Sequence, residues 1–172
     1  MSLSQPKRIL IIKLRHHGDV LLSTPVVDAL KTRFPDCEID MLVYAGTGQL
    51  IADNPQIAQI FTIDRNWKKL GVFKQLKCEK NLFSKLKARD YDWAFNLSDQ
   101  WRAAIIAKLC ARCSVGLDCI KRDGFWWRFC HDFINHELDP SHHIVENQLN
   151  ILAPLIQPED VADAKVRLWV AQ

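Results

Sequence analysis

Residues 8–34, "RILIIKLRHHGDVLLSTPVVDALKTRF", pass from a strand pattern to a helix pattern and decide the fold class. The first seven residues, 8–14, are mostly apolar without alternation, which is typical of a parallel strand covered by helices on both faces. From residue 19 onward, apolar side chains recur at helical spacing, at Val20, Val27, Leu30 and Phe34. A buried strand that leads directly into a helix predicts the first β-α unit of an open parallel sheet.

The same alternation continues along the chain. Apolar runs predict further strands at residues 39–44, 57–63, 92–97 and 114–118. Helical spacing predicts helices at residues 80–89, 101–112 and 142–156. The series predicts an α/β, Rossmann-like open parallel sheet with helices on both faces, joined by right-handed crossovers. We expect this domain to occupy residues 1–156, with an aromatic and basic loop after residue 118 and a linker at residues 157–172.

Composition narrows the class of protein. The chain has 172 residues, of which 48% are hydrophobic, so it can bury the core of one ordinary domain. It has no run of about 18 consecutive apolar residues, and its first residues, "MSLSQPKR", lack the apolar core of a secretory signal, so a cytoplasmic location is expected. Its six cysteines are therefore expected to be reduced thiols. Cys110 and Cys113 form a C-x-x-C pair, but the later cysteine spacings match no usual zinc pattern and the pair falls in a predicted helix, so no metal site is expected.

Positive charge is concentrated in one block. The formal net charge is +3, yet residues 65–90 contain nine Lys or Arg residues and only two acids. The remainder of the chain is therefore net negative. Two interpretations stay open for this block at the sequence level: a solvated helix face, or a surface that binds phosphate groups.

Residues 15–19 follow the first predicted strand, where ligands gather in open α/β sheets. The segment contains a single glycine, Gly18, so it is neither a dinucleotide fingerprint nor a P-loop. Asp19 either caps the following helix, a contribution of about 1 kcal/mol, or faces the cleft. Thr24 with Pro25 offers a second helix start, which would release the Asp19 carboxylate from capping.

Several segments together resemble a known family. Residues 9–44 and the later segments "IDRNWKK" (63–69), "DYDWAFNLSDQWRAA" (90–104) and "KRDGFWWR" (121–128) are similar to the ADP-heptose lipopolysaccharide heptosyltransferases of glycosyltransferase family nine, in particular to the core heptosyltransferase III type. The resemblance runs from residue 8 to about residue 156. It implies a GT-B fold of two Rossmann-like domains, of which this chain is the N-terminal, acceptor-binding one. The donor ADP-heptose would be held mainly by the absent half, and no cofactor or metal is implied.

The resemblance also implies roles for individual residues. Asp19 would be the general base that removes a proton from an acceptor heptose hydroxyl as it attacks the anomeric carbon with inversion, and such help is worth roughly 10² to 10⁴ in rate. Gly18 would let the acceptor approach the backbone. Trp126 and Trp127 would either stack on sugar, lie at the membrane surface, or pack in the core or at a contact between domains. The residues expected to contact the anionic acceptor are His16, His17, Gly18, Arg65, Lys68, Lys69, Arg102, Lys121, Arg122 and Arg128.

The implied partner is the lipid A-linked core oligosaccharide, met at the inner face of the inner membrane of a Gram-negative bacterium. The isolated chain is expected to transfer no heptose. One alternative is a non-enzymatic Rossmann-like module that binds anionic glycolipid or nucleic acid, although no nucleic-acid-binding motif appears and the net charge is modest, so no nucleic acid partner is expected. Another is a family-nine transferase that acts on a different glycan with the same aspartate chemistry.

Overall fold

The computed structural model describes residues 5–117, 124–135, 143–156, 164 and 166. Strands in this part of the chain are β1 (Arg8–Lys13), β2 (Glu38–Tyr44), β3 (Gln59–Ile63), β4 (Tyr91–Asn96), β5 (Ala111–Leu117) and β6 (Phe133–Asn135). Its α-helices are α1 (His17–Leu21), α2 (Thr24–Arg33), α3 (Val72–Ala88), α4 (Trp101–Cys110), α5 (Phe125–Phe129) and α6 (Ile144–Leu149). Short 3-10 helices are η1 (Thr47–Ile51), η2 (Arg65–Lys69) and η3 (Asn150–Leu152).

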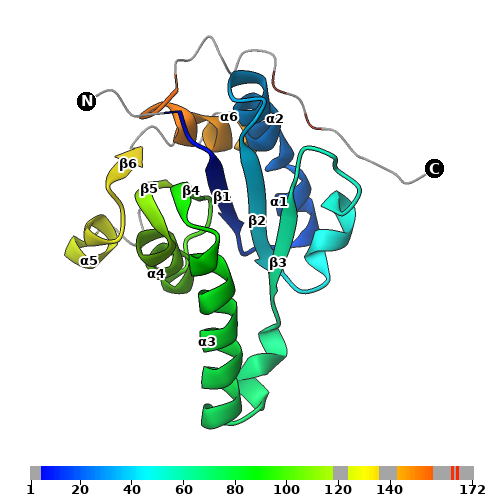
Figure 1. Cartoon of the computed structure of the whole chain (residues 1–172), viewed down its shortest axis with the longest axis vertical. Helices are drawn as coiled ribbons and strands as arrows, with labels where there is room; N and C mark the ends of the chain where they lie inside the picture. The colour runs from blue at the N-terminus through cyan, green and yellow to red at the C-terminus, as the bar shows by residue number, and fades with distance from the viewer. Residues whose placement is uncertain (1–4, 118–123, 136–142, 157–163, 165, 167–172) are drawn as a thin grey trace.

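The strands form one parallel sheet in the order β3-β2-β1-β4-β5-β6 (Figure 1). From β1 the chain first builds outward through β2 and β3, and then returns to place β4 on the other side of β1. Such a reversal opens a crevice at the carboxyl ends of the two central strands, where ligands of open α/β sheets bind. The predicted α/β, Rossmann-like fold is confirmed.

Each face of the sheet carries its own core. Ile9 and Ile11 of β1 point to one side, into a core shared with α1, α2, α6 and η3, whereas Leu10 and Ile12 point to the other side, into a core shared with α3 and α4. All four side chains are fully buried. Burying an aliphatic side chain of this size is worth roughly 1.5–3 kcal/mol, so a strand covered on both faces has to be apolar throughout. The predicted helices on both faces are confirmed.

The helix predicted to start at residue 19 is two helices, and Pro25 explains the break. A continuous helix would need the residue 25 amide to donate to the carbonyl of Leu21, and proline has no N–H. Side-chain hydroxyls satisfy the carbonyls instead: Thr24 Oγ1 donates to Leu21 O at 2.8 Å, and Ser23 Oγ donates to Val20 O at 2.6 Å. Pro25 lies in the first turn of α2, as the sequence indicated, and the N-cap is Ser23 rather than Thr24.

Other boundaries differ more. Helix α3 begins at Val72, eight residues before the predicted start, and α5 and β6 lie where a loop was predicted. The prediction that the C-x-x-C pair lies in one helix is wrong, because α4 ends at Cys110 and Cys113 belongs to β5. The cysteines of the described residues are free thiols, and no group of three or more metal-ligating side chains forms among those residues. The linker predicted for residues 157–172 falls almost entirely outside the described residues.

None of the helices in the described part of the chain has the length and apolar character needed to cross a bilayer.

Candidate functional site

The joint between β1 and α1 places Asp19 beside the crevice of the sheet. Asp19 is the third residue of α1 and is partly buried. The N-cap residue of this helix is His16, whose side chain makes no capping hydrogen bond. Within the described residues, the Asp19 carboxylate accepts no hydrogen bond from the backbone of its own helix or from a side chain. Asp19 therefore makes no capping hydrogen bond within the described residues, while its place in the first turn of α1 lets its charge complement the helix dipole.

Lys13 provides a buried positive charge near this joint. It is the last residue of β1, is only 5% exposed, and donates from Nζ to the carbonyl of Leu97 at 3.1 Å. Burial lowers the pKa of Lys13 from its usual 10.5 to about 8, while the negative charges of Asp19 and Asp99 oppose that shift. Sequence reasoning missed Lys13, although a lysine that interrupts an apolar strand at its carboxyl end was a visible signal.

Hydrogen bonds tie together the carboxyl ends of β1, β2 and β4. Ser98 Oγ accepts from the amide of Leu14 at 2.6 Å, and Gln100 Nε2 donates to the carbonyl of Leu14 at 2.9 Å. On the other side of Gln100, Oε1 accepts from the Tyr44 hydroxyl at 2.6 Å. The Arg65 guanidinium lies 4.1 Å from the centre of the Tyr44 ring, a cation–π contact. These contacts connect Arg65 of η2, through Tyr44 and Gln100, to the end of β1.

A pocket of about 500 Å³ opens at this edge of the sheet. Its walls come from the β1–α1 joint, the end of β2, η2 and the start of α4. Cationic and hydrogen-bonding side chains predominate, so the pocket is suited to an anionic, hydroxyl-rich ligand. The lining residues are His16, Tyr44, Arg65, Lys68, Gln100, Trp101 and Arg102.

Four of the residues predicted to contact the acceptor thus line one pocket: His16, Arg65, Lys68 and Arg102. Arg102 is also paired with Glu79 of α3, at 2.6 Å between NH2 and Oε1, so its charge is partly balanced within the chain. Tyr44, Gln100 and Trp101 were not predicted, because nothing local in the sequence distinguishes them and only the sheet order brings them together.

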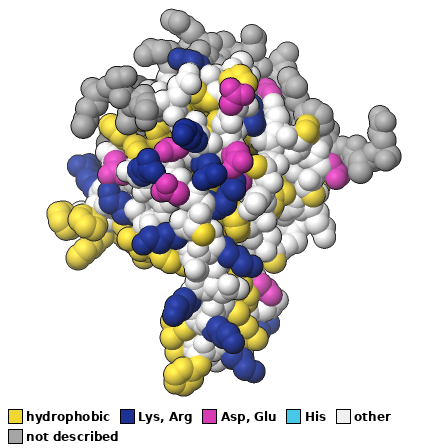
Figure 2. Space-filling model, in the orientation of Figure 1, with side chains coloured by type: hydrophobic (Ala, Val, Ile, Leu, Met, Phe, Trp, Pro, Cys, Tyr) yellow, Lys and Arg dark blue, Asp and Glu magenta, His cyan; other side chains and the backbone are white. Residues whose placement is uncertain are grey.

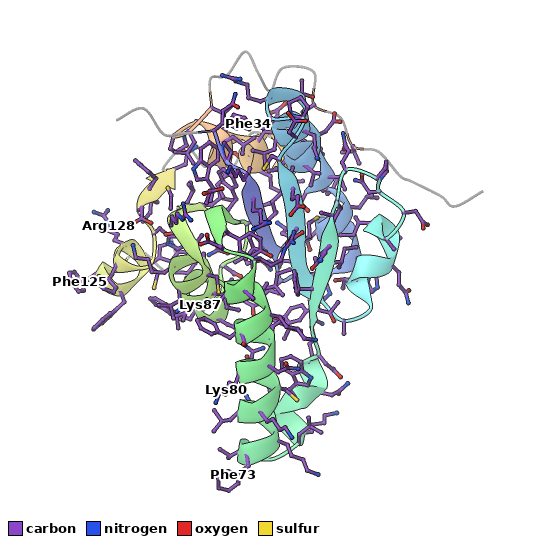
Figure 3. The ribbon with its side chains drawn as sticks, viewed as in Figure 1. Phe34, Phe73, Lys80, Lys87, Phe125 and Arg128 are labelled. Carbon is purple, nitrogen blue, oxygen red and sulfur yellow. The ribbon has the colours of Figure 1, made fainter. Side chains whose placement is uncertain are left out.

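The other predicted contacts are more scattered. His17 and Gly18 are exposed in α1, and Lys69 is exposed in η2; none of the three lines the pocket. Arg128 is exposed in α5, away from the pocket lining (Figure 3). Lys121 and Arg122 lie outside the described residues.

The structure also places Asp99 and the two adjacent tryptophans. Asp99 pairs with Arg15, at 3.2 Å between Oδ2 and NH2, and the N-cap of α4 is Gln100. Trp127 is 1% exposed and packs edge-on against Trp101, so the core interpretation is correct for this residue. Trp126 is 67% exposed and remains available to a partner.

His131 does not line the pocket, but it forms hydrogen bonds with α5 and with β4 next to it. Its Nδ1 donates to the carbonyl of Trp127 at 2.9 Å, which leaves Nε2 to accept from Asn96 Nδ2 at 3.2 Å. Burial lowers the pKa of His131, so the ring is held neutral. Asn96 Oδ1 in turn accepts a hydrogen bond from the amide of Ser98 at 3.0 Å. The hydrogen bonds of His131 and Asn96 together therefore link α5 to the loop after β4.

Comparison with known proteins shows the family of this chain. The sequence model of glycosyltransferase family 9 (heptosyltransferase) matches residues 80–168, more than half of the chain. The chain belongs to this family. Lipopolysaccharide heptosyltransferase 3 of Escherichia coli K12 is 39% identical over 147 residues, which cover 83% of this chain and 40% of that protein. Lipopolysaccharide heptosyltransferase 1 of the same strain is 24% identical over 144 residues, which cover 82% and 43%.

Solved structures of this family share the fold. A family 9 glycosyltransferase from Veillonella parvula superposes with a TM-score of 0.76 at 21% identity, over 100% of this chain and 47% of that one. The E. coli heptosyltransferase WaaC, solved with ADP-2-deoxy-2-fluoro heptose, gives a TM-score of 0.73 at 20% identity, over 86% and 47%. This family 9 chain therefore spans less than half the length of the relatives it matches.

Proposed function

We propose that this chain is the acceptor-binding half of a lipopolysaccharide heptosyltransferase, which transfers heptose from ADP-heptose to the core oligosaccharide. Family membership and the identity to lipopolysaccharide heptosyltransferase 3 support the reaction class. The observation that carries the proposal is the position of Asp19 at the β1–α1 joint. Asp19 is not itself a lining residue of the cationic pocket, but it lies three residues after His16, which is one.

In the proposed reaction Asp19 acts as the general base. An acceptor hydroxyl is too weak an acid to ionise beforehand, so it needs a proton acceptor within hydrogen-bond reach as it attacks. The oxygen forms a bond to the anomeric carbon of the donor, the bond from that carbon to the diphosphate breaks, and ADP leaves with the electron pair. Asp19 takes the hydroxyl proton. Attack opposite to the leaving group inverts the anomeric configuration.

The cationic pocket would orient the acceptor for this step. Arg65 and Lys68 of η2 line it, and their position is supported by the stack of Arg65 on Tyr44. A phosphorylated core oligosaccharide offers anionic groups to these cations and hydroxyls to Gln100 and His16. The predicted contacts of His17, Gly18, Lys69, Arg128, Lys121 and Arg122 belong to the same proposal, as a wider surface around the pocket.

The donor would be bound by a second, Rossmann-like domain of a GT-B fold, since the matched relatives are more than twice the length of the matched segment. For this reason the 172-residue chain alone should bind acceptor without transferring heptose. The whole enzyme would work at the cytoplasmic face of the inner membrane, where a lipid-linked acceptor is presented.

The test uses a full-length protein that carries this chain, supplied with ADP-heptose and a core acceptor, with product followed by mass spectrometry. The Asp19→Asn variant should lose transfer while it keeps its fold and its affinity for the acceptor. Wild-type turnover in this variant would refute the base assignment. If the chain instead binds generic DNA as tightly as it binds core oligosaccharide, with an affinity for DNA that falls steeply with salt, that result would favour the non-enzymatic alternative.

A further inference from the structure

A projecting arm extends past the carboxyl edge of the sheet. We define the α3 arm as residues 65–80, which comprise η2, the connection to α3 and the first half of α3. Figure 1 shows it standing clear of the sheet and its covering helices, and Figure 3 places Phe73 at its tip. The second half of α3 is anchored, because Leu82 and Leu86 pack in the core that this helix shares with α4. The arm is thus an extension of a well-seated helix.

The tip of the arm is apolar and exposed. Phe73 is 90% exposed, Val72 71%, Leu76 59% and Leu70 44%. Single exposed apolar residues are ordinary on a protein surface, but four of them within seven positions at a projecting tip form a patch that calls for a partner. The patch continues along the groove between α3 and α4, where Ile105 and Leu109 are also about half exposed.

Lysines surround this apolar tip. The α3 arm carries five of them, together with Arg65, and a single acid, Glu79, whose carboxylate is already paired with Arg102 of α4. Figure 2 shows the blue side chains along the arm above its yellow tip. The lysines are Lys68, Lys69, Lys74, Lys77 and Lys80.

We propose that the α3 arm docks on an anionic phospholipid bilayer, with Phe73 and its apolar neighbours at the level of the acyl chains and the lysines among the headgroups. An apolar point ringed by cations matches the layered chemistry of such a surface, in which headgroup charge lies above hydrocarbon. A folded protein partner would instead need a concave apolar socket ringed by acids placed to match each flexible lysine. The identity of the membrane rests on the proposed function. The binding of the α3 arm to an anionic bilayer does not.

A second projecting element has the same character. Phe125 is 75% exposed, Trp126 67% and Phe129 62%, all on α5. Figure 2 shows yellow side chains projecting at α5 as well as at the tip of the α3 arm. Tryptophan concentrates at membrane–water interfaces, and phenylalanine is common on the apolar face of helices that lie on a membrane surface. Two separate contacts would fix the orientation of the molecule on the bilayer, which one tip cannot do.

Docking by the α3 arm has a consequence for the acceptor pocket. Arg65 and Lys68, which line the pocket, lie at the base of the same arm. Seating the tip in the bilayer therefore brings the pocket towards the headgroup layer, the level at which a lipid-linked oligosaccharide begins.

The experiment measures co-sedimentation of the 172-residue chain with vesicles that contain phosphatidylglycerol, and separately with pure phosphatidylcholine vesicles, both free of lipopolysaccharide. Phe73→Ser should lower the partition coefficient at least about tenfold, as expected for withdrawing a buried phenyl ring. Lys74→Gln with Lys77→Gln should lower it about 25-fold on anionic vesicles only. Ile144→Ser and Lys7→Gln, matched changes at the opposite edge of the sheet, should alter it less than about twofold.

A Phe73→Trp variant gives a readout that does not depend on loss of binding. Its added fluorescence should shift to the blue on anionic vesicles and be quenched by brominated acyl chains. Equal partitioning of the arm variants and the matched controls, or a tryptophan at residue 73 that no brominated lipid quenches, would overturn the proposal. So would a loss of self-association in Phe73→Ser with unchanged vesicle binding, which would make the tip an interface between copies of the chain.

Failure of this proposal is distinguishable from failure of the proposed function. Binding of soluble, delipidated core oligosaccharide depends on the pocket and not on the tip. If that binding persists while vesicle binding is absent, only the docking surface is wrong. If vesicle binding follows the pattern above while the oligosaccharide does not bind, docking stands and the acceptor assignment falls.

Discussion

The buried carboxylate of Asp40 should be the strongest single polar contributor to the position of α3. Asp40 lies in β2 and is fully buried. It accepts hydrogen bonds from the Tyr91 hydroxyl at 2.6 Å and from Arg89 at 2.7 Å (Nε) and 3.2 Å (NH2). Arg89 is the C-cap residue of α3, so these bonds fasten the end of that helix to the sheet. The Asp40 carboxylate raises the pKa of Arg89, and burial together with this hydrogen bond raises the pKa of Tyr91.

The Asp40→Asn substitution preserves the shape of the side chain and removes its charge. Breaking a buried ion pair by removing one partner typically costs about 3–5 kcal/mol. The Arg89 side chain is 20% exposed and keeps a second contact with Glu38 at 2.8 Å, so we expect the lower end, about 3 kcal/mol. For a chain of this length, that corresponds to a fall in Tm of about 6–12 °C.

The matched control is Glu38→Gln, which removes the other carboxylate bound to the same guanidinium. Glu38 is 48% exposed, and exposed pairs contribute about 0–1 kcal/mol, so its Tm should fall by no more than about 4 °C. Thermal unfolding followed by circular dichroism compares the two variants directly. Tm values for Asp40→Asn and Glu38→Gln within about 2 °C of each other would refute the argument that burial decides the contribution.

Three further predictions concern Gly116, His131 and Cys113. Gly116→Ala should lower the free energy of unfolding, measured in urea, by about 1–3 kcal/mol, because the added Cβ would lie 2.6 Å from the His131 ring. Gly124→Ala is the control: its Cβ would meet nothing within 4 Å, so it should cost less than about 1 kcal/mol. Burial lowers the pKa of His131, so below about pH 6.5 the unfolded chain binds a proton at this residue more readily than the folded chain does. The urea midpoint should therefore fall as the pH drops below about 6.5. A midpoint that stays constant from pH 8 to pH 5 would contradict this. Burial raises the pKa of the Cys113 thiol to about 11, so at pH 8 a thiol reagent should modify the less buried Cys78 before Cys113. Peptide mapping identifies the modified residue. The reverse order would contradict the packing of Cys113.

Local patterns predicted the fold because the fold rests on local requirements. A strand covered on both faces must be apolar throughout, and that run is visible in residues 8–14 without any knowledge of its neighbours. The start of α3 was missed for the opposite reason. Its first turns, from Val72 to Leu76, expose their apolar side chains, so they show no buried stripe that would mark a helix against a core. Strand β6 has only three residues, too few for a pattern.

The site divides in the same way. Asp19 was predicted because a charge after a glycine at the end of a buried strand is a local signal, and the resemblance gave it a role. Tyr44 and Gln100 were not, since 56 residues separate them and their hydrogen bond exists only through the order of the strands. Lys13 escaped notice because the surrounding apolar run outweighed one polar position.

Single-turnover kinetics test most directly whether the Asp19 carboxylate takes the acceptor's proton. The rate constant for heptose transfer is compared between Asp19→Asn and Asp99→Asn in a full-length protein that carries this chain, with acceptor affinity and Tm measured on the same samples. Asp99 is a matched control, because it is a partly exposed carboxylate at the end of the neighbouring central strand and is paired with Arg15. Asp19→Asn should slow transfer by about 10² to 10⁴ with unchanged affinity and Tm, and Asp99→Asn by less than about tenfold. Equal rates in the two variants, or a loss in Asp19→Asn that a lowered Tm accounts for, would contradict the claim.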